Sequence, residues 1–304
     1  MSMGKAKLTF LGTGTSQGVP IIGCHCPVCS SADPHDKRLR SAALVEYGGL
    51  TILVDAGPDF RIQMLREDIC HLDAILLTHN HMDHTGGLDD VRALNYIDRK
   101  AVHIYCEPKV LETLKIMFGY AFAEHKYPGS PEWRIHLIDD NPFAVMPVEG
   151  GDLVWMHEKG YCMQMPDGSV IPCGNDIIST AKKPTEELIA AGGVKIIPIR
   201  GYHDKMPVLG FRFGDIAYIT DMSSIPESEF DKLRGLKHLT LNTVSYHPHH
   251  SHFSLSEAIA LAQKIGAEHT WLTHLSHTFP SHSQFDSELP SGISPAFDGL
   301  VISD

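Results

Sequence analysis

Four side chains that can bind metal ions follow one short apolar run of the sequence. Residues 74–77 read Ala-Ile-Leu-Leu, a composition typical of a buried strand. The metal-capable side chains behind it are His79, His81, Asp83 and His84. Histidines two apart face the same side of an extended segment, whereas the neighbours Asp83 and His84 diverge and can serve a second ion. Imidazole and carboxylate ligands together suit zinc, iron or manganese. The pattern therefore predicts a metal site rather than a solvated polar turn.

Three cysteines form a second candidate metal site. Cys24, Cys26 and Cys29 can converge on one face of a tight loop. Tetrahedral zinc needs four ligands, so one is missing locally. Our candidate for the fourth ligand is His277, and His25 inside the loop remains an alternative. Without a metal, the three cysteines would be free, partly buried thiols.

Composition limits the classes of function. The chain has 304 residues, 43% of them hydrophobic, which suits one large globular domain. The formal charge of −12 argues against a surface that holds long nucleic acid by counterion release. A small anionic substrate stays open, because bound metals supply local positive charge.

Cysteine usage and apolar runs indicate the compartment. Seven cysteines are an odd number, and three of them cluster, which favours a metal site in a reducing compartment, the cytoplasm. We find no stretch of about 18 apolar residues and no signal-peptide pattern at the start of the chain. We therefore expect no membrane association.

The candidate ligands must be positioned by strand ends and helix starts. Strands are expected at 7–11, 41–47, 50–54, 74–77, 102–106, 194–199, 216–220, 268–272 and 296–302. Helices are expected at 59–66, 88–97, 109–118, 254–265 and 281–289, the fourth opening with Ser254 and Glu257 as a capping box. The glycine-rich loop at 12–18 lacks the Gly-Lys-Ser/Thr ending of a nucleotide-binding loop. Asp55, after the strand at 50–54, is either a hydrogen-bond partner of a ligand histidine or an ordinary turn residue.

The run His-Asn-His-Met-Asp-His at 79–84 resembles the HxHxDH signature of the metallo-β-lactamase superfamily. The order of further segments is similar to the family of cyclic-phosphate phosphodiesterases of bacterial phosphonate degradation. These segments are the Gly-Thr-Gly loop, residues 17–20, the cysteine loop and residues 272–277. The resemblance implies an α+β fold, the four-layer αββα sandwich. It also implies two active-site metal ions, and one structural zinc held by Cys24, Cys26, Cys29 and His277.

The resemblance also implies which later residues complete the site. His203 matches the next metal histidine, Asp221 the bridging carboxylate, His274 the last ligand, and His252 an accessory histidine that contacts phosphate or protonates the leaving oxygen. We expect one ion on His79, His81 and His203, the other on Asp83, His84 and His274, with Asp221 shared. Asp83 and His252 are the predicted catalytic residues. His247, His249 and His250 are interpreted as solvated.

One segment departs from the family pattern. Residues 123–184 form a longer stretch than the family leads us to expect, with a hairpin predicted at 160–172 that turns at 166–168. We predict a single domain over 1–304 in which the segment near 123–184 is an inserted cap.

These features predict a phosphodiesterase that uses two divalent ions, manganese or zinc, and a metal-bridging hydroxide. Its expected partner is a small, cyclic, ribose- or nucleotide-like phosphodiester, with no long nucleic acid, and a homodimer is left open. A tRNA 3′-processing nuclease is an alternative, but the chain shows no Lys/Arg run for a basic exosite. A thioesterase or lactamase on the same metals is chemically open as well.

Overall fold

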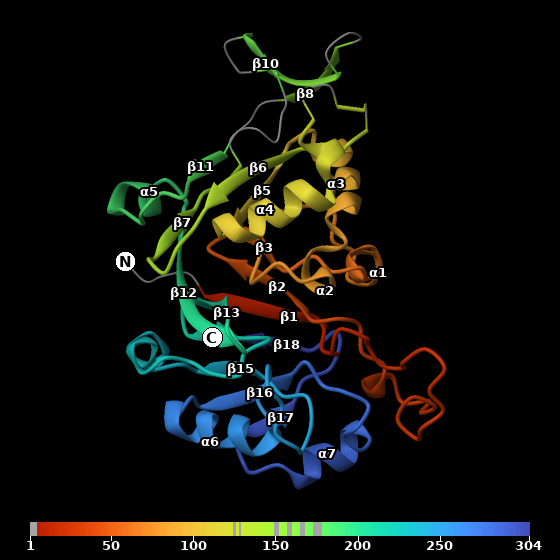
Figure 1. Ribbon diagram of the computed structural model, residues 1–304. Coiled ribbons are helices and arrows are strands. Elements are labelled where there is room, and N and C mark those ends of the chain that lie inside the picture. Colours follow the sequence, from red (N-terminus) through yellow and green to blue (C-terminus); the bar gives the residue numbers. More distant parts are fainter. Residues whose placement is uncertain are drawn as a thin grey trace. The chain divides into compact units, whose positions relative to one another are not determined.

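Two compact units make up the chain. The computed structural model describes residues 5–123, 126–127, 129–148, 152–156, 160–164, 168–172 and 178–304. The first unit combines Met1–Gly48 with Ile196–Asp304, and the second is Gly49–Lys195. Each unit contains strands and helices (Figure 1). The predicted single domain with an inserted cap stays a prediction.

Five parallel strands form the main sheet of the second unit. They follow the order β11-β6-β5-β4-β3, and every neighbouring pair is parallel. Their bounds are β3 (Leu50–Val54), β4 (Ala74–Leu76), β5 (Val102–Cys106), β6 (Trp133–Leu137) and β11 (Ile178–Thr180). Parallel strands with both faces covered are apolar throughout, and all three residues of β4 are buried. The carboxyl ends of β3 and β4 therefore lie at the same edge of this sheet.

Short helices connect these strands. They are α1 (Phe60–Arg66), α2 (Met82–Thr85), α3 (Arg92–Asp98), α4 (Pro108–Met117) and α5 (Glu186–Ala190), with 3-10 helices at Leu88–Val91 and Gly119–Ala121. In Figure 1, α4 lies across β5 and β6, and its buried residues are Val110, Leu111 and Leu114. The helices predicted at 59–66 and 109–118 are confirmed within one residue. The helix predicted at 88–97 is divided into the first 3-10 helix and α3.

The segment near 123–184 contains a small antiparallel sheet of its own. Its strands are β8 (Asp152–Met156), β9 (Gly160–Gln164) and β10 (Val170–Pro172), in the order β10-β9-β8, and β7 (Phe143–Val145) precedes them. The predicted hairpin is present, since Val170 pairs with Gln164 across β9 and β10. Residues 166 and 167 of its predicted turn lie outside the described residues.

The first unit contributes two sets of strands. In one set, β1 (Ala6–Gly12) lies between β2 (Ala42–Tyr47) and β18 (Val301–Ser303), antiparallel to both. The other follows the order β17-β16-β15-β14-β13-β12. Its strands are β12 (Val194–His203), β13 (Met206–Phe213), β14 (Ile216–Tyr218), β15 (His238–Asn242), β16 (His269–Thr273) and β17 (Ile293–Pro295).

Strand direction in this second set places several loops at one edge. The pairs from β14 to β17 are parallel, and β13 is antiparallel to both β12 and β14. Consequently β12 runs parallel to β14, and the carboxyl ends of β12, β14, β15 and β16 share one edge. Ligands bind at such edges in sheets of parallel strands.

Helices α6 (Leu255–Ile265) and α7 (His282–Glu288) complete the first unit, with 3-10 helices at Pro34–Asp36 and Glu227–Leu233. The predicted capping box of α6 is present: the Ser254 backbone N–H donates to Oε2 of Glu257 over 2.8 Å, and the Ser254 side chain accepts from the backbone at the third helical position. α6 packs on a buried apolar cluster through Ala258. This cluster also contains Phe253 and, from the strands, Ile219, Leu239 and Leu272. None of the helices in the described part of the chain has the length and apolarity that crossing a bilayer requires.

Three strands of the first unit, β13, β15 and β17, were not predicted. β13 contains a proline and a glycine, which normally weaken the case for a strand. β17 has only three residues, too few for a periodic pattern. The strand predicted at 296–302 is wrong in extent, because only Val301–Ser303 pairs with β1.

The capping box yields a test of how α6 is held. Replacing Ser254 by alanine (S254A) should lower the free energy of unfolding by about 1 kcal/mol, because the cap of the first turn is lost. Urea denaturation followed by circular dichroism measures this. Gln263→Ala, an exposed position in the same helix, is the matched control and should change stability by less than half as much. Equal effects of the two substitutions would contradict the capping role.

Candidate metal centre

The histidine loop, defined here as residues 79–84, begins just after β4. His81 has extended backbone and directly precedes α2, which contains residues 82–84 of the histidine loop. The ring centroid of His79 lies 4.6 Å from that of His81 and 4.3 Å from that of His84. His79 and His84 are buried, whereas His81 and Asp83 are partly exposed. Three imidazoles are thus packed into one small volume.

Asp55 orients the buried histidine of this loop. Its carboxylate, fully buried, accepts from Nδ1 of His84 over 2.7 Å. It also accepts from the backbone N–H and the hydroxyl of Thr78, over 2.9 and 2.8 Å. Burial raises the pKa of Asp55, and the contacts with His84 and Thr78 oppose that rise. A carboxylate that holds Nδ1 of a histidine assigns metal binding to Nε2. The geometry therefore favours Asp55 as the hydrogen-bond partner of a ligand histidine over Asp55 as an ordinary turn residue.

Two glycines allow the end of β3 to approach the histidine loop. The backbone N–H of Ala56 donates to the carbonyl of His84 over 2.8 Å, and the N–H of Gly87 donates to the carbonyl of Ala56 over 2.8 Å. A Cβ atom on Gly57 would lie 1.9 Å from the backbone oxygen of Asp83. One on Gly87 would lie 2.0 Å from the backbone oxygen of Gly57. The close approach therefore excludes any side chain at either position.

Asp221 lies at the centre of a second ligand set, in the first unit. Its Oδ1 is 3.7 Å from Nδ1 of His252, and its Oδ2 is 3.3 Å from Nδ1 of His274. Nδ1 of His203 lies 3.1 Å from the backbone oxygen of Asp221. One ligand atom each from His203, Asp221 and His252 lies within 4.8 Å of the others. Two oxygens facing different imidazoles are what a carboxylate shared between two cations would present.

Asp55 and two residues of the first unit's ligand set have left-handed backbone at strand ends. The φ angles are 65° for Asp55, 56° for Asp221 and 58° for His274. This region costs a residue other than glycine about 1–2 kcal/mol. Such strain persists where the surrounding structure imposes it, commonly at functional sites. At each of these residues the backbone turns and the strand ends, so the side chain does not continue the alternation of the strand.

Several residues that support the ligands were missed at the sequence level. The Ser41 hydroxyl donates to the carbonyl of Gly14 over 2.9 Å and lies 3.2 Å from Nδ1 of His274. The Thr220 hydroxyl donates to Oδ2 of Asp221 over 2.8 Å. The amide of Asn242 bonds both the N–H and the carbonyl of Met222, over 2.8 and 2.9 Å. A hydroxyl or amide carries no spacing signal, so nothing in the sequence marks these partners.

The surroundings of His252 disfavour its protonated ring. Burial, together with the nearby imidazole of His274, lowers the pKa of His252 to about 3. The ring is therefore neutral near pH 7. The His252 centroid is 4.6 Å from that of His203 and 4.8 Å from that of His274.

The predicted ligands fall into one set in each unit. The second unit brings together His79, His81, Asp83 and His84, and the first brings together His203, Asp221, His252 and His274. That the two sets hold one pair of ions stays a prediction.

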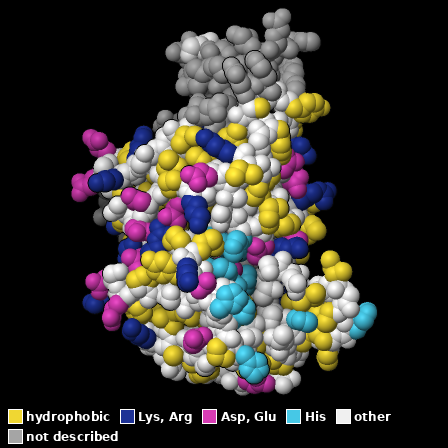
Figure 2. Space-filling model, viewed as in Figure 1, with side chains coloured by type: hydrophobic (Ala, Val, Ile, Leu, Met, Phe, Trp, Pro, Cys, Tyr) yellow, Lys and Arg dark blue, Asp and Glu magenta, His cyan; other side chains and the backbone are white. Residues whose placement is uncertain are grey.

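The three cysteines surround one imidazole within the first unit. Nδ1 of His277 lies 3.3 Å from Sγ of Cys24, 3.6 Å from Sγ of Cys26 and 3.5 Å from Sγ of Cys29. His25 is exposed and lies outside this group, so the geometry selects His277 of the two candidates. The loop extends from β1 in Figure 1, and Figure 2 shows hydrophobic side chains at its surface.

These distances fit a tetrahedral zinc ion. Zinc–sulfur and zinc–nitrogen bonds of about 2.3 and 2.05 Å at a tetrahedral angle separate sulfur and nitrogen by about 3.6 Å. The backbone N–H of Cys29 lowers the pKa of Cys26 to about 6, whereas burial raises that of Cys29 to about 11. Thiolate is the form that binds metal, and the lowered pKa of Cys26 makes its thiolate the main form near pH 7. A bound cation would favour deprotonation of the other two cysteines. Zinc occupancy itself stays a prediction.

Comparisons with known proteins agree with this arrangement. A β-lactamase superfamily domain matches residues 51–156 and 164–275. The crystal structure of a new diphosphatase from the PhnP family is 37% identical, with a TM-score of 0.77, over 99% of this chain and 97% of the other. Zn²⁺-bound PqqB from Methylobacterium extorquens is 18% identical, with a TM-score of 0.62, over 97% and 99% of the chains, a likeness in fold alone. An octanoyltransferase of Porphyromonas gingivalis is 34% identical over 97% of this chain but 51% of its own. The chain spans about half the length of the first curated relatives it matches.

The close approach of two backbone segments predicts a severe effect of one methyl group. Gly57→Ala should destabilise the protein by at least about 3 kcal/mol and displace the histidine loop, because the added carbon meets a backbone oxygen that cannot rotate away. Thermal unfolding measures it. Gly119→Ala is the control, since a Cβ there meets nothing within 4 Å. Similar melting temperatures for G57A and wild type would refute the steric argument.

The cysteine cluster predicts one zinc ion that depends on His277. Purified His277→Ala protein should contain one zinc ion fewer per chain than wild type, as measured by plasma mass spectrometry. His25→Ala should retain the full zinc content, because that side chain lies outside the group. Loss of zinc in H25A but not in H277A would reverse the assignment.

Proposed function

Because the chain belongs to the β-lactamase superfamily and, within it, to the PhnP family, we propose that it is a phosphodiesterase that uses two divalent metal ions. Membership makes the protein a metal-dependent hydrolase and confirms the predicted α+β sandwich fold. The phosphodiester specificity, the number of ions and their identity belong to the proposal. The PhnP-family relative is a diphosphatase, and its similarity over nearly the full chain supports chemistry at phosphorus.

The observation that carries the proposal is the placement of the Asp221 carboxylate. Its two oxygens face His252 and His274, and Thr220 holds one of them. Nitrogen and oxygen ligands of this kind suit zinc and manganese. We assign one ion to His79, His81 and His203, and the second to Asp83, His84 and His274, with Asp221 shared. Bound divalent cations would polarise phosphoryl oxygens and lower the pKa of water.

The chain's own residues then orient the metal ligands and exchange protons with the substrate. Asp55 keeps His84 in the tautomer that presents Nε2, and Ser41 fixes the ring of His274. Neutral His252 can donate a hydrogen bond to a phosphoryl oxygen. A nearby anionic phosphate would stabilise the protonated ring, and in that form His252 could protonate a leaving oxygen. Asp83 would hold its ion and accept a proton at its carboxylate.

A small substrate fits the charge of the protein better than RNA does. The chain carries 37 acidic and 25 basic residues, and a nuclease that holds tRNA needs a basic surface. We therefore propose a small phosphodiester, cyclic or ribose- or nucleotide-like, as the partner. We expect weaker activity on thioesters, lactams and precursor tRNA.

Activity assays test this proposal directly. Protein loaded with manganese or zinc should hydrolyse cyclic or linear phosphodiesters, such as 2′,3′-cyclic AMP and bis(4-nitrophenyl) phosphate, faster than a thioester or a lactam. Asp221→Asn should lower kcat/KM at least about 100-fold, because the shared carboxylate loses its charge. Asp204→Asn is the matched control, an exposed residue with a similar φ of 55°. Absence of turnover on every phosphodiester with both ions bound would reject the function.

A further inference from the structure

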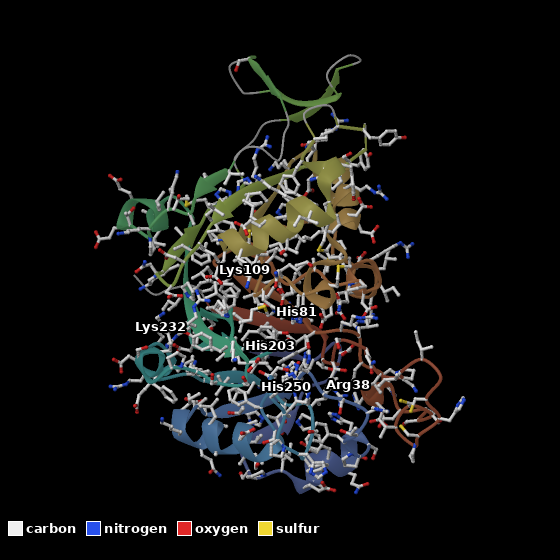
Figure 3. The ribbon with its side chains drawn as sticks, viewed as in Figure 1. Arg38, His81, Lys109, His203, Lys232 and His250 are labelled. Carbon is white, nitrogen blue, oxygen red and sulfur yellow. The ribbon has the colours of Figure 1, made fainter. Side chains whose placement is uncertain are left out.

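A buried arginine contacts the glycine-rich loop of the first unit. Arg38, labelled in Figure 3, is 6% exposed and lies in the segment before β2. Its Nη1 donates to the Thr13 hydroxyl over 2.8 Å and to the carbonyl of Ala296 over 2.5 Å, and its Nη2 lies 3.2 Å from Nδ1 of His282. Burial lowers the pKa of Arg38 to about 10, so the guanidinium is charged near pH 7. A buried charge needs such partners, and the proposed metal centre assigns no role to this one.

The guanidinium holds Thr13 together with a carboxylate. Thr13 is fully buried. Its hydroxyl accepts from Arg38 and donates to Oδ1 of Asp298 over 2.7 Å, and Oδ2 of Asp298 accepts from the backbone N–H of Leu39 over 2.8 Å. Because the single hydroxyl proton goes to the carboxylate, only a donor can replace Arg38 at the hydroxyl oxygen. Thr13 is thus fixed between a cation and an anion.

Two sets of contacts connect the glycine-rich loop to the proposed metal ligand His274. The Thr13 carbonyl accepts from the backbone N–H of Leu275, the next residue after the ligand, over 2.8 Å. The Gly14 carbonyl accepts from the Ser41 hydroxyl over 2.9 Å, and the Ser41 oxygen lies 3.2 Å from Nδ1 of His274. The φ angle of His274 is 58°, which is uncommon for a residue other than glycine. The turn at His274 therefore depends on contacts that hold it.

The contact with Ser41 also sets the tautomer of His274. A hydroxyl has one proton, and that of Ser41 goes to the carbonyl of Gly14. The Ser41 oxygen is therefore an acceptor, and Nδ1 of neutral His274 carries the ring proton. Oδ2 of Asp221, 3.3 Å from the same nitrogen, favours the same tautomer. Nε2 then has its lone pair free for a cation.

We propose that Arg38 is a positioning residue for the active-site ion bound by His274. The guanidinium fixes Thr13, the Thr13 carbonyl fixes the turn at Leu275, and this turn places Nε2 of His274. The inference rests on the assignment of His274 as a ligand in the proposed function. Arg38 acts through Thr13 and His274 rather than by contact with the ion.

Manganese binding tests the inference without requiring turnover. Manganese suits nitrogen and oxygen ligands, whereas thiolates select zinc, so Mn²⁺ reports on the active-site ligands rather than on the cysteine cluster. Manganese-loaded protein is diluted stepwise, and electron paramagnetic resonance of the free ion gives the dissociation constant. Arg38→Met should weaken binding at least about tenfold, the effect expected when a ligand loses its support. Arg38→Lys keeps a donor for the Thr13 hydroxyl and should restore part of the affinity.

A double substitution shows whether Arg38 acts through His274. His274→Ala should weaken Mn²⁺ binding more than R38M does. In the H274A background, R38M should have little further effect, because both substitutions then act on one interaction. A purely structural role of Arg38 would give effects that add.

Arg212→Met is the matched control. Arg212 is a partly buried arginine of the same unit whose guanidinium also donates to backbone carbonyls, those of Gly214, Lys232 and Arg234. R212M should lower the melting temperature and leave Mn²⁺ binding unchanged. The inference is overturned if R38M binds Mn²⁺ like wild type, if R212M weakens binding equally, or if the effects of R38M and H274A add.

A second variant covers the case in which R38M does not fold. Thr13→Val removes the hydroxyl and keeps the carbonyl, so it should weaken Mn²⁺ binding in the same direction, and wild-type affinity would overturn the inference. Two other failures are seen separately. Wild-type Mn²⁺ affinity in H274A would refute the ligand assignment, and absence of turnover on 2′,3′-cyclic AMP and the other phosphodiesters by the metal-loaded wild type would refute the function.

Discussion

Parallel strand pairing is the constraint on which the candidate centre depends. Strands that run in one direction end at one edge, so the residues following them are gathered there irrespective of their distance in sequence. In the second unit this gathers Asp55, after β3, with the histidine loop, after β4. In the first unit it gathers His203, the last residue of β12, with Asp221 and His274, which follow β14 and β16. The strand residues are mostly apolar and form the core, whereas the polar residues that could bind metal lie at the strand ends.

A layer of buried hydrogen bonds then fixes the ligands. Burying a polar group without a hydrogen-bond partner costs free energy. Here the hydrogen-bond partners also set the orientation of the ligand side chains. Asp55 is held by Thr78 and holds His84, while Ser41 and Thr220 contact His274 and Asp221. Left-handed backbone at Asp55, Asp221 and His274 turns each side chain out of its strand direction.

The cysteine cluster and the metal-ligand edge share one short segment. His274 belongs to the ligand set around Asp221, and His277, three residues later, lies among the cysteines. Between them, the backbone N–H of Leu275 donates to the carbonyl of Thr13 over 2.8 Å, at the glycine-rich loop after β1. A zinc ion at the cysteines would therefore restrain a segment whose other end carries a metal ligand. Such an ion would have a structural task.

The sequence by itself determined the residue types and the strands that precede the ligands, because ligand chemistry and local periodicity are local properties. The histidine run, the cysteine loop, the capping box at Ser254 and Glu257 and several helices follow from spacings of a few residues. Only the tertiary structure decided which distant groups meet. The choice of His277 over His25 links positions about 250 residues apart in the chain, and the contact of Ser41 with His274 is of the same kind. The glycines at 57 and 87 were likewise indistinguishable from ordinary turn residues until the backbone packed against them. Such contacts depend on strand order and close packing, which no local pattern encodes.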